Sequence, residues 1–315
     1  MDLKQLEYIV AIAEYGNITK AAESLFISQS GLNQQLIKLE KELGIQLFNR
    51  NNHYLHMTKA GEIYVRNARE ILQIQKNTYS ELDDLKGNMT GEISLGLTHE
   101  HGIDLFTSIF RDFNARYPGY TFNLLEKIVV EQNSLLQKGD LDFALVMLGK
   151  ADRADLEYLE IFTEPLVLGI PKAHPFADLA AGPGHPLTPI DLKLFKEEKF
   201  SLIFASSTMR SVIDPAFKAA GFRPQLLVET AMNHALVQLV SKNFCCTIIP
   251  QSRAMSSPYS SNCAWFTLTT PLYWDVCLAY RRNMRFNAAQ QCFIKLAKAY
   301  GARMQEDLAK NIPLF

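Results

Sequence analysis

The chain of 315 residues has few cysteines, no long apolar run and no excess of charge of either sign. Its five cysteines show no C-x-x-C spacing, so we expect reduced thiols in the core of a cytosolic protein. No stretch reaches the roughly 18 apolar residues that a membrane helix needs. Glu7 interrupts the first apolar residues before a signal-peptide core forms. The sequence therefore predicts a cytoplasmic protein without a membrane partner.

The charge balance and several missing motifs exclude further classes. The 32 Lys and Arg against 33 Asp and Glu give a net charge of −1, which excludes a polycationic nucleic-acid binder but allows a local basic face. The chain lacks G-x-S-x-G, G-x-x-x-x-G-K-[ST] and G-x-G-x-x-G, and no cysteine has a recognisable nucleophile context. We therefore predict neither an enzyme nor a bound cofactor.

The first 58 residues have the pattern of three helices and a hairpin. The first helix is indicated by apolar residues at three- and four-residue steps, namely Leu3, Leu6, Ile9, Val10 and Ala13. Gly16-Asn17 ends it. Thr19 is the expected cap of a short second helix, and Ser28 is the expected cap of a third.

The third helix has one apolar and one polar face. Its apolar face is formed by Leu32, Leu36, Leu39 and Leu43. Its polar face carries amides, a hydroxyl and an amine, which pair with base edges and phosphates: Gln29, Ser30, Asn33, Gln34 and Lys38. Many surface helices have such a face, but two helices joined by a short turn are typical of a helix-turn-helix.

A small hairpin follows, with strands at 46–48 and 54–57. Its predicted tip carries Arg50, Asn51, Asn52 and His53, which would reach phosphate or the minor groove as a wing. Thr58 then caps a long helix over 59–86. This rod of roughly 40 Å has a coiled-coil-like seam that a 58-residue domain is too short to cover. We expect it to pair with a second copy, ahead of a flexible joint at 87–91.

Beyond Gly91 strands and helices alternate, which predicts an α/β domain with a mostly parallel sheet. We expect strands at 93–97, 120–125, 141–146, 200–204 and 245–249, and helices at 104–115, 133–138, 209–220 and 233–241. The run 173–189 is rich in Ala, Gly and Pro and is expected to be an exposed connection.

The N-terminal motif resembles the LysR-type transcriptional regulators. The residues that carry the resemblance are Ala21-Ala22, Leu25, Ile27-Ser28-Gln29-Ser30, Leu32, Gln35, Leu39-Glu40, Leu43-Gly44, Leu47-Phe48, Arg50, Thr58 and Ala60-Gly61. Weaker marks follow at Leu135, Gly139, Leu141, Asp142, Arg210, Gly221, Glu229, Leu239-Val240 and Pro250. Asn33 departs from the Ser or Thr that is usual there, and the wing has fewer arginines than is common.

The resemblance implies three parts. These are a winged helix-turn-helix domain at 1–58, a dimerisation helix and hinge at 59–90, and a two-lobed effector-binding domain at 91–315 similar to periplasmic binding proteins. Lobe one would span 91–163 and 267–315, and lobe two 164–266. The family binds double-stranded promoter DNA as a dimer of dimers through its linker helices and effector domains, and RNA polymerase is a further candidate partner. A small effector between the lobes would change DNA binding or bending.

Candidate effector contacts lie at strand ends and helix starts. Thr98 and His99 follow the first strand of lobe one, and Ser206, Ser207 and Thr208 open a helix in lobe two. Arg210 is expected to bind either the effector or a structural Glu. The remaining candidates are Glu131, Met147, Phe204 and Asn233. The hydroxyl-rich helix start favours a small carboxylate as the effector.

Two alternatives remain at this point. His99, Glu100 and His101 together invite a metal interpretation, but no other His/Cys cluster is present and we predict no metal site. A further alternative is that His101 is a solvent-exposed residue at a helix start. The second alternative is that the chain is a small-molecule sensor that acts through a protein partner, with its N-terminal helices as a dimerisation module. The amide-rich third helix argues against this, because protein interfaces favour aromatic and apolar centres.

Overall fold

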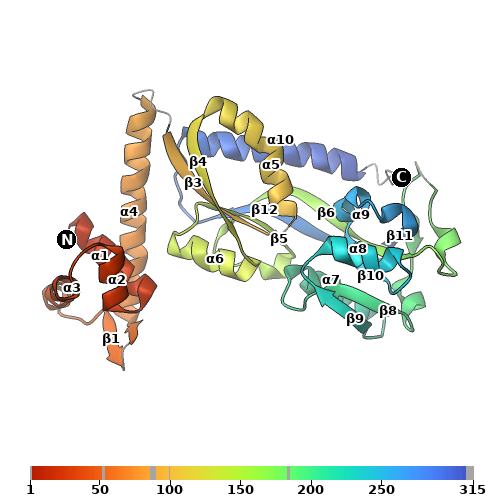
Figure 1. Ribbon diagram of the computed structural model, residues 1–315, viewed down its shortest axis with the longest axis horizontal. Helices are drawn as coiled ribbons and strands as arrows, with labels where there is room; N and C mark the ends of the chain where they lie inside the picture. The colour runs from red at the N-terminus through yellow and green to blue at the C-terminus, as the bar shows by residue number, and fades with distance from the viewer. Residues whose placement is uncertain (1, 52–53, 86–89, 99, 183–184, 310–315) are drawn as a thin grey trace. The chain divides into compact units, whose positions relative to one another are not determined.

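The computed structural model describes residues 2–51, 54–85, 90–98, 100–182 and 185–309. The chain divides into two compact units, Met1–Asn88 and Met89–Phe315 (Figure 1). No helix within the described residues is long and apolar enough to cross a membrane. The five cysteines are buried and free, as expected for reduced core thiols.

In the N-terminal unit, the residues that the structure describes form three short helices, the two strands of a hairpin and a long helix. These are α1 (Leu3–Tyr15), α2 (Ile18–Ser24), α3 (Gln29–Leu43), β1 (Phe48–Asn51), β2 (Tyr54–Met57) and α4 (Lys59–Leu85). Gly16 ends α1 in the left-handed conformation (φ 56°), as a glycine allows. The cap of α2 is Asn17, whose Oδ1 accepts from the Lys20 amide, so the prediction that Thr19 caps this helix is wrong.

The core of this unit is formed where the first three helices meet the hairpin and α4. It contains Ile9, Ile12, Ala21, Ala22, Leu32, Leu36, Leu39, Leu47, Phe48 and Val65. The apolar faces predicted for α1 and α3 each include one residue too many, because Leu3 is 39% and Leu43 is 45% exposed. Gly61 is required where α4 starts, since a Cβ there would overlap the Leu47 carbonyl. Thr58 caps α4, because its hydroxyl accepts from the Gly61 amide at 3.1 Å.

The first strand of the hairpin extends further than predicted. Asn49, Arg50 and Asn51 belong to β1, and the register pairs Asn51 with Tyr54. Asn49, Arg50 and Asn51, which were assigned to the turn, therefore extend a strand, because the ladder continues to the end of β1.

The C-terminal unit is built on a mixed sheet. Its strands run in the spatial order β4 (Gly119–Glu126), β3 (Thr90–Leu97), β5 (Phe143–Leu148), β12 (Leu272–Tyr280), β6 (Glu157–Pro171), β11 (Cys263–Leu268) and β7 (Pro189–Ile190), with β10 (Thr247–Pro250) also paired to β6. A parallel pair, β8 (Lys199–Ile203) and β9 (Gln225–Thr230), lies beside β10 through a bridge from Phe200 to Cys246.

Strand β6 connects two lobes of this unit. Its first part, up to Leu166, pairs with β12, and its last residues pair with β10 and β11. We call the part with β3, β4 and β5 lobe one, and the part with β7–β11 lobe two. The prediction of a mostly parallel sheet holds within lobe one but not at the crossing, because β12 runs antiparallel to β5 and β6.

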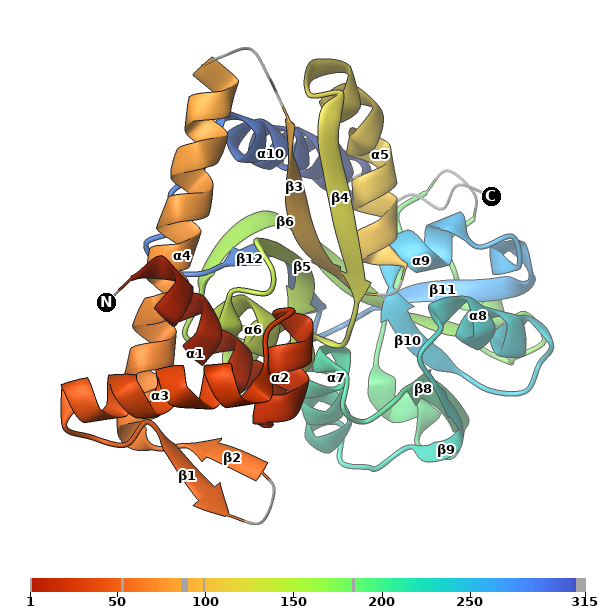
Figure 2. The same cartoon turned by 60° about the vertical axis from the view of Figure 1, so that its left-hand side comes forward.

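Helices cover both faces of the lobe-one sheet. Phe143, Leu145 and Met147 pack in one core with α5 (His101–Arg116) and α10 (Ala288–Ala309). Ala144, Val146 and Leu148 face the other way, toward α6 (Val129–Lys138). Figure 2 shows α5 beside β4 and α10 across the same side of the sheet. Because successive side chains of β5 point to opposite faces of the sheet, each face has its own apolar set for a helix to cover.

The described residues of lobe two form three α-helices. They are α7 (Thr208–Ala219), α8 (Asn233–Ser241) and α9 (Gln251–Ser256). Short 3-10 turns lie at Lys150–Asp152, Ala177–Leu179, Leu192–Phe195 and Ser260–Asn262. Helices α7 and α8 begin close to the predicted positions, and each follows a strand, so their N-termini lie near the strand ends.

Candidate DNA-binding face and effector cavity

Helix α3 presents its predicted polar face to solvent. The Ser28 hydroxyl caps the helix by accepting from the Gly31 amide at 3.1 Å. Of the polar residues at and after this cap, Ser28, Gln29, Ser30, Gln34 and Lys38 are exposed and Asn33 is half-buried. Amides, hydroxyls and one amine are therefore accessible along a single helix, as base and phosphate recognition requires.

Two hydrogen bonds to the Glu40 carboxylate hold the hairpin against α3, and the sequence analysis did not identify this contact. One oxygen of Glu40 accepts from the Leu47 amide at 2.7 Å and from the Phe48 amide at 3.1 Å. The Glu40 carboxylate therefore fixes the position of the start of β1 relative to α3. Asn52 and His53, predicted at the wing tip, lie outside the described residues. Thr19 is exposed in the first turn of α2.

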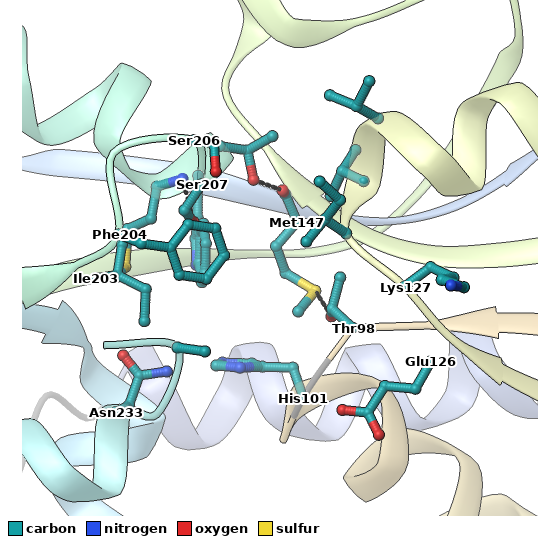
Figure 3. Close-up of a pocket in the computed structure, with 17 residues that line it drawn as sticks. Thr98, His101, Glu126, Lys127, Met147, Ile203, Phe204, Ser206, Ser207 and Asn233 are labelled. Carbon is teal, nitrogen blue, oxygen red and sulfur yellow. Dashed lines mark hydrogen bonds between the residues drawn. The ribbon is translucent and has the colours of Figure 1, made fainter. Parts of the chain in front are cut away.

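A cavity of about 330 Å³ lies where the two lobes meet (Figure 3). Seven predicted effector contacts line it: Thr98, Met147, Phe204, Ser206, Ser207, Thr208 and Asn233. The other lining residues are His101, Glu126, Lys127, Ile128, Val129, Val130, Ile203, Met209, Ala231 and Trp274. The walls are thus largely apolar, with polar groups at the strand ends and helix starts, as is usual for small-molecule sites.

Two predicted effector contacts lie elsewhere. Arg210 is 8% exposed and binds Glu229 (2.7 Å), Asp214 (2.7 Å) and the Ile203 carbonyl (3.0 Å). Of the two roles considered for Arg210, the structure shows the structural one. Glu131 does not line the cavity, because it is on the exposed side of α6 and pairs with Lys127 at 3.4 Å. His99 lies outside the described residues.

Two of the hydroxyl groups at the start of α7 form hydrogen bonds within the protein. Ser207 accepts from the Met209 amide at 3.3 Å and so acts as the helix cap. Thr208 donates its hydroxyl hydrogen to the Met147 carbonyl at 2.6 Å, which joins lobe two to lobe one at the cavity wall (Figure 3). Thr208 therefore holds the lobes together and retains only acceptor capacity toward a ligand.

A buried hydrogen-bonded pair, His101 and Glu164, lies at the floor of the cavity. The Nε2 atom of His101 lies 3.0 Å from Oε2 of Glu164 and 3.2 Å from the Ser252 hydroxyl. Glu164 also accepts from the Ser252 amide (2.7 Å) and from Nε1 of Trp274 (3.2 Å). Burial by itself raises the pKa of Glu164, but the charge of His101 and the hydrogen bonds from His101 and Ser252 outweigh it and lower that pKa. The alternative in which His101 is a solvent-exposed residue at a helix start is wrong, because His101 is buried.

A second contact closes the cavity between the lobes. Glu100 precedes α5 with φ at +66°, a conformation that non-glycine residues rarely adopt. Its two oxygens accept from Nδ2 of Asn233 at 2.8 Å and from the His234 amide at 3.3 Å. A lobe-one carboxylate thus caps the first turn of lobe-two helix α8.

Several cavity residues were missed for identifiable reasons. Glu126 and Lys127 end strand β4, so the strand-end argument used for Thr98 would have found them. Trp274 in the lining and Glu164 beneath it gave no local signal, because their contacts with His101 join three distant segments. Over the ranges that the structure describes, no group of three His, Cys, Asp or Glu residues is arranged to hold a metal ion.

Comparisons with known proteins match both units to one family. The model for "Bacterial regulatory helix-turn-helix protein, lysR family" matches residues 3–62, and that for "LysR substrate binding domain" matches residues 86–302. The uncharacterized HTH-type transcriptional regulator YwbI of Bacillus subtilis is 28% identical over 301 residues, which are 95% of this chain and 97% of that protein.

Two solved structures show the same fold at low sequence identity. A full-length OxyR variant from Pseudomonas aeruginosa has a TM-score of 0.67 at 21% identity and covers 95% of this chain and 97% of that one. The effector-binding domain of QuiR, solved with shikimate, has a TM-score of 0.55 at 20% identity and covers 68% of this chain and 98% of that one. The match over residues 3–62 favours DNA binding over the alternative dimerisation module. The chain belongs to the LysR family of bacterial transcriptional regulators, whose members are DNA-binding proteins with an effector-binding domain and not enzymes.

Proposed function

We propose that a small carboxylate bound in the cavity changes the closure of the two lobes and thereby the promoter binding or bending of this regulator. The observation that carries the proposal is that the cavity is bridged by contacts between the lobes, Thr208 to Met147 and Glu100 to Asn233. A ligand that touches both lobes has a different affinity for the open and closed arrangements, and only such a difference shifts the equilibrium between them.

The preference for an acid rests on the polar groups of the cavity. Ser206 and Ser207 lie at the start of α7, where the partial positive charge of the helix favours anions. Lys127 adds an ammonium group to the same lining, which also contains the Glu126 carboxylate. Shikimate, bound by the similar domain of QuiR, is itself a small carboxylic acid.

Dimer formation through α4 is the second part of the proposal. Beyond the part of α4 that packs on the N-terminal core, the helix exposes Ile74 (63%), Tyr79 (62%) and Leu82 (46%), and Ile63 (51%) is exposed nearer its start. Exposed apolar residues on a long helix are typical of pairing with another helix. Two pairs joined through their effector domains would form the tetramer, in the cytoplasm, where the DNA and RNA polymerase are.

The N-terminal unit would read the operator through α3 in the major groove. Gln29, Asn33 and Gln34 carry the amides suited to base edges, while Ser28, Ser30 and Lys38 suit phosphates. Thr19, Arg50, Asn52 and His53 remain proposed contacts to the backbone or minor groove.

Fluorescence anisotropy on DNA from upstream of the protein's own gene tests the proposal. We expect binding that a scrambled duplex lacks, and a shift in that binding when a panel of small acids is added. Thr98→Ala and Thr208→Ala should abolish the shift and leave DNA binding intact. Loss of DNA binding in both variants would contradict the effector role, and a response to neutral or cationic compounds in preference to acids would remove the carboxylate.

A further inference from the structure

The threonine hydroxyls of the cavity are used within the protein. Thr98 donates to the Met147 sulfur at 3.4 Å, and Thr208 donates to the Met147 carbonyl at 2.6 Å. A hydroxyl has one hydrogen to donate. Neither threonine therefore offers a donor to an anionic ligand while these bonds remain.

The donors at the floor of the cavity already face carboxylates. Nε1 of Trp274 donates to Glu164 at 3.2 Å, and Nε2 of His101 lies 3.0 Å from the same carboxylate. Nδ2 of Asn233 donates to Glu100 at 2.8 Å. A ligand carboxylate placed against any of these groups would lie beside Glu164 or Glu100, and like charges repel strongly where water is excluded.

The other side-chain hydroxyls of the lining lie at the start of α7. Ser206 is exposed, and its hydroxyl makes no hydrogen bond with the residues that the structure describes. Ser207 accepts from the Met209 amide at 3.3 Å, so its own hydrogen is left to donate. Within the described residues, the lining thus offers hydroxyl donors to an anion at one end only.

The far end of the cavity carries no surplus of positive charge. Figure 3 shows Ser206 and Ser207 on one side of the cavity and Glu126 and Lys127 on the other. Lys127 pairs with Glu131 at 3.4 Å, so its charge is matched by that residue. A second carboxylate on a ligand held at Ser206 would therefore meet the Glu126 carboxylate.

The start of α6 gives this far end an apolar wall. Ile128, Val129 and Val130 line the cavity, and Ile128 is 40% and Val130 67% exposed. A second cavity of about 350 Å³ shares Thr98 and Glu126 with the first. Its other lining residues are Leu97, Glu100, Ile103 and Leu124. An apolar ligand body would cover exposed apolar surface here, whereas an anionic group would be opposed by two glutamates.

We infer that the effector carries a single carboxylate, held at the start of α7, on an apolar body, and that Glu126 is the specificity-determining residue that rejects a second negative group. The inference rests on the proposed function, in that the cavity holds an acidic effector. Discrimination against a diacid then comes from repulsion at one end and not from a better contact at the other.

Calorimetry with the full-length protein and three acids tests this. In 4-methylbenzoate and terephthalate, a methyl group and a carboxylate occupy the same ring position. We expect 4-methylbenzoate to bind about tenfold more tightly, because the second charge of terephthalate is desolvated without a cationic partner. Acetate, which has the carboxylate and almost no apolar body, should bind at least about tenfold more weakly than 4-methylbenzoate.

Variants separate the two ends of the cavity. Glu126→Gln should raise the affinity for terephthalate about threefold or more and change that for 4-methylbenzoate by less than about twofold. Glu197→Gln removes the same charge at an exposed position outside the cavity and should change neither affinity. Ser206→Ala should weaken 4-methylbenzoate about fivefold, since a hydroxyl donor to the carboxylate is lost. Far-ultraviolet circular dichroism checks the fold of each variant.

The outcomes separate this inference from the proposal on which it rests. Terephthalate that binds as tightly as 4-methylbenzoate, or a methyl preference that is unchanged in Glu126→Gln, would overturn the inference and leave an acidic effector in place. An equal gain for terephthalate in Glu126→Gln and Glu197→Gln would also overturn the role of Glu126. If 4-methylbenzamide binds as tightly as 4-methylbenzoate, or if no probe binds, the carboxylate proposal itself is overturned.

Discussion

His101 Nε2 lies 3.0 Å from the Glu164 carboxylate, and neither side chain is more than 5% exposed. His101 opens a lobe-one helix, Glu164 lies on the strand that crosses between the lobes, and Ser252 from lobe two donates to the same carboxylate. The pair therefore ties both lobes together beneath the cavity. A buried charge of this kind is stable only while its partners remain in place.

Replacement of Glu164 by Gln should strongly destabilise the C-terminal unit. The neutral amide removes the carboxylate partner of His101 and turns an NH₂ group either to the Ser252 amide, at the site of Oε1, or to His101 and Trp274, at the site of Oε2. We expect a loss of about 3–5 kcal/mol in the free energy of unfolding, measured by urea denaturation at neutral pH. Glu160→Gln, at a half-exposed ion pair with Arg153, should cost no more than about 1 kcal/mol. Equal losses in the two variants would contradict the importance of burial.

The pH dependence of stability should differ between wild type and Glu164→Gln. The folded protein lowers the pKa of Glu164, so this carboxylate stabilises the fold above the ordinary pKa of about 4.3. That contribution is lost as the pH falls through the lowered pKa of the folded state. We expect the wild type to lose unfolding free energy more steeply than the variant below about pH 4.3. Parallel stability curves for the two proteins would count against the assignment.

Two α3 substitutions should affect DNA binding in different ways. Lys38→Ala removes an exposed cation, so we expect weaker binding and a salt slope reduced by about 0.9. Gln34→Ala removes an amide suited to base edges and should weaken specific binding without changing the slope. Anisotropy titrations in increasing salt measure both, and an identical change of slope in both variants would be inconsistent with these roles.

Arg210→Met should affect stability and not ligand affinity. The substitution leaves Glu229 and Asp214 without the guanidinium that they share. We expect a loss of about 1–3 kcal/mol, and unchanged calorimetric affinity for any acid that binds the cavity. Lys218→Met, at an exposed position of the same helix, should change stability by less than about 0.5 kcal/mol. A selective loss of acid affinity in Arg210→Met would restore this residue as an effector contact.

Gly61→Ala should destabilise the N-terminal unit by about 1–3 kcal/mol through overpacking. The new Cβ would meet the Leu47 carbonyl, which is part of the backbone and has little freedom to move. Hydrogen exchange of α1–α3 amides measures the loss. Gly182→Ala, where a Cβ meets no atom within 4 Å, is the matched control. If both variants exchange as the wild type does, the packing interpretation is wrong.

Local sequence signals determined most elements of the fold. Ser28 and Thr58 were recognised as caps because a cap depends only on neighbouring backbone amides. The cap of α2 was misplaced by two residues, since Asn17 and Thr19 are both good caps and only the packed helix shows which one is used. The apolar stripes of α1 and α3 were correct in their middle parts and wrong at Leu3 and Leu43, because the ends of a helix extend beyond the core that covers them.

The sequence by itself determined the winged helix-turn-helix, the long helix, the α/β effector domain and the strand ends where Thr98 and Ser206–Thr208 lie. These depend on periodicity, caps and turns within a few residues. Only the tertiary structure decided that Arg210 binds Glu229, that His101 is buried against Glu164, and that Glu100 holds the Asn233 amide. Each of these contacts joins segments that come together only when the chain folds, so whether a polar side chain is paired within the protein or left for a ligand cannot be deduced from its neighbours in sequence.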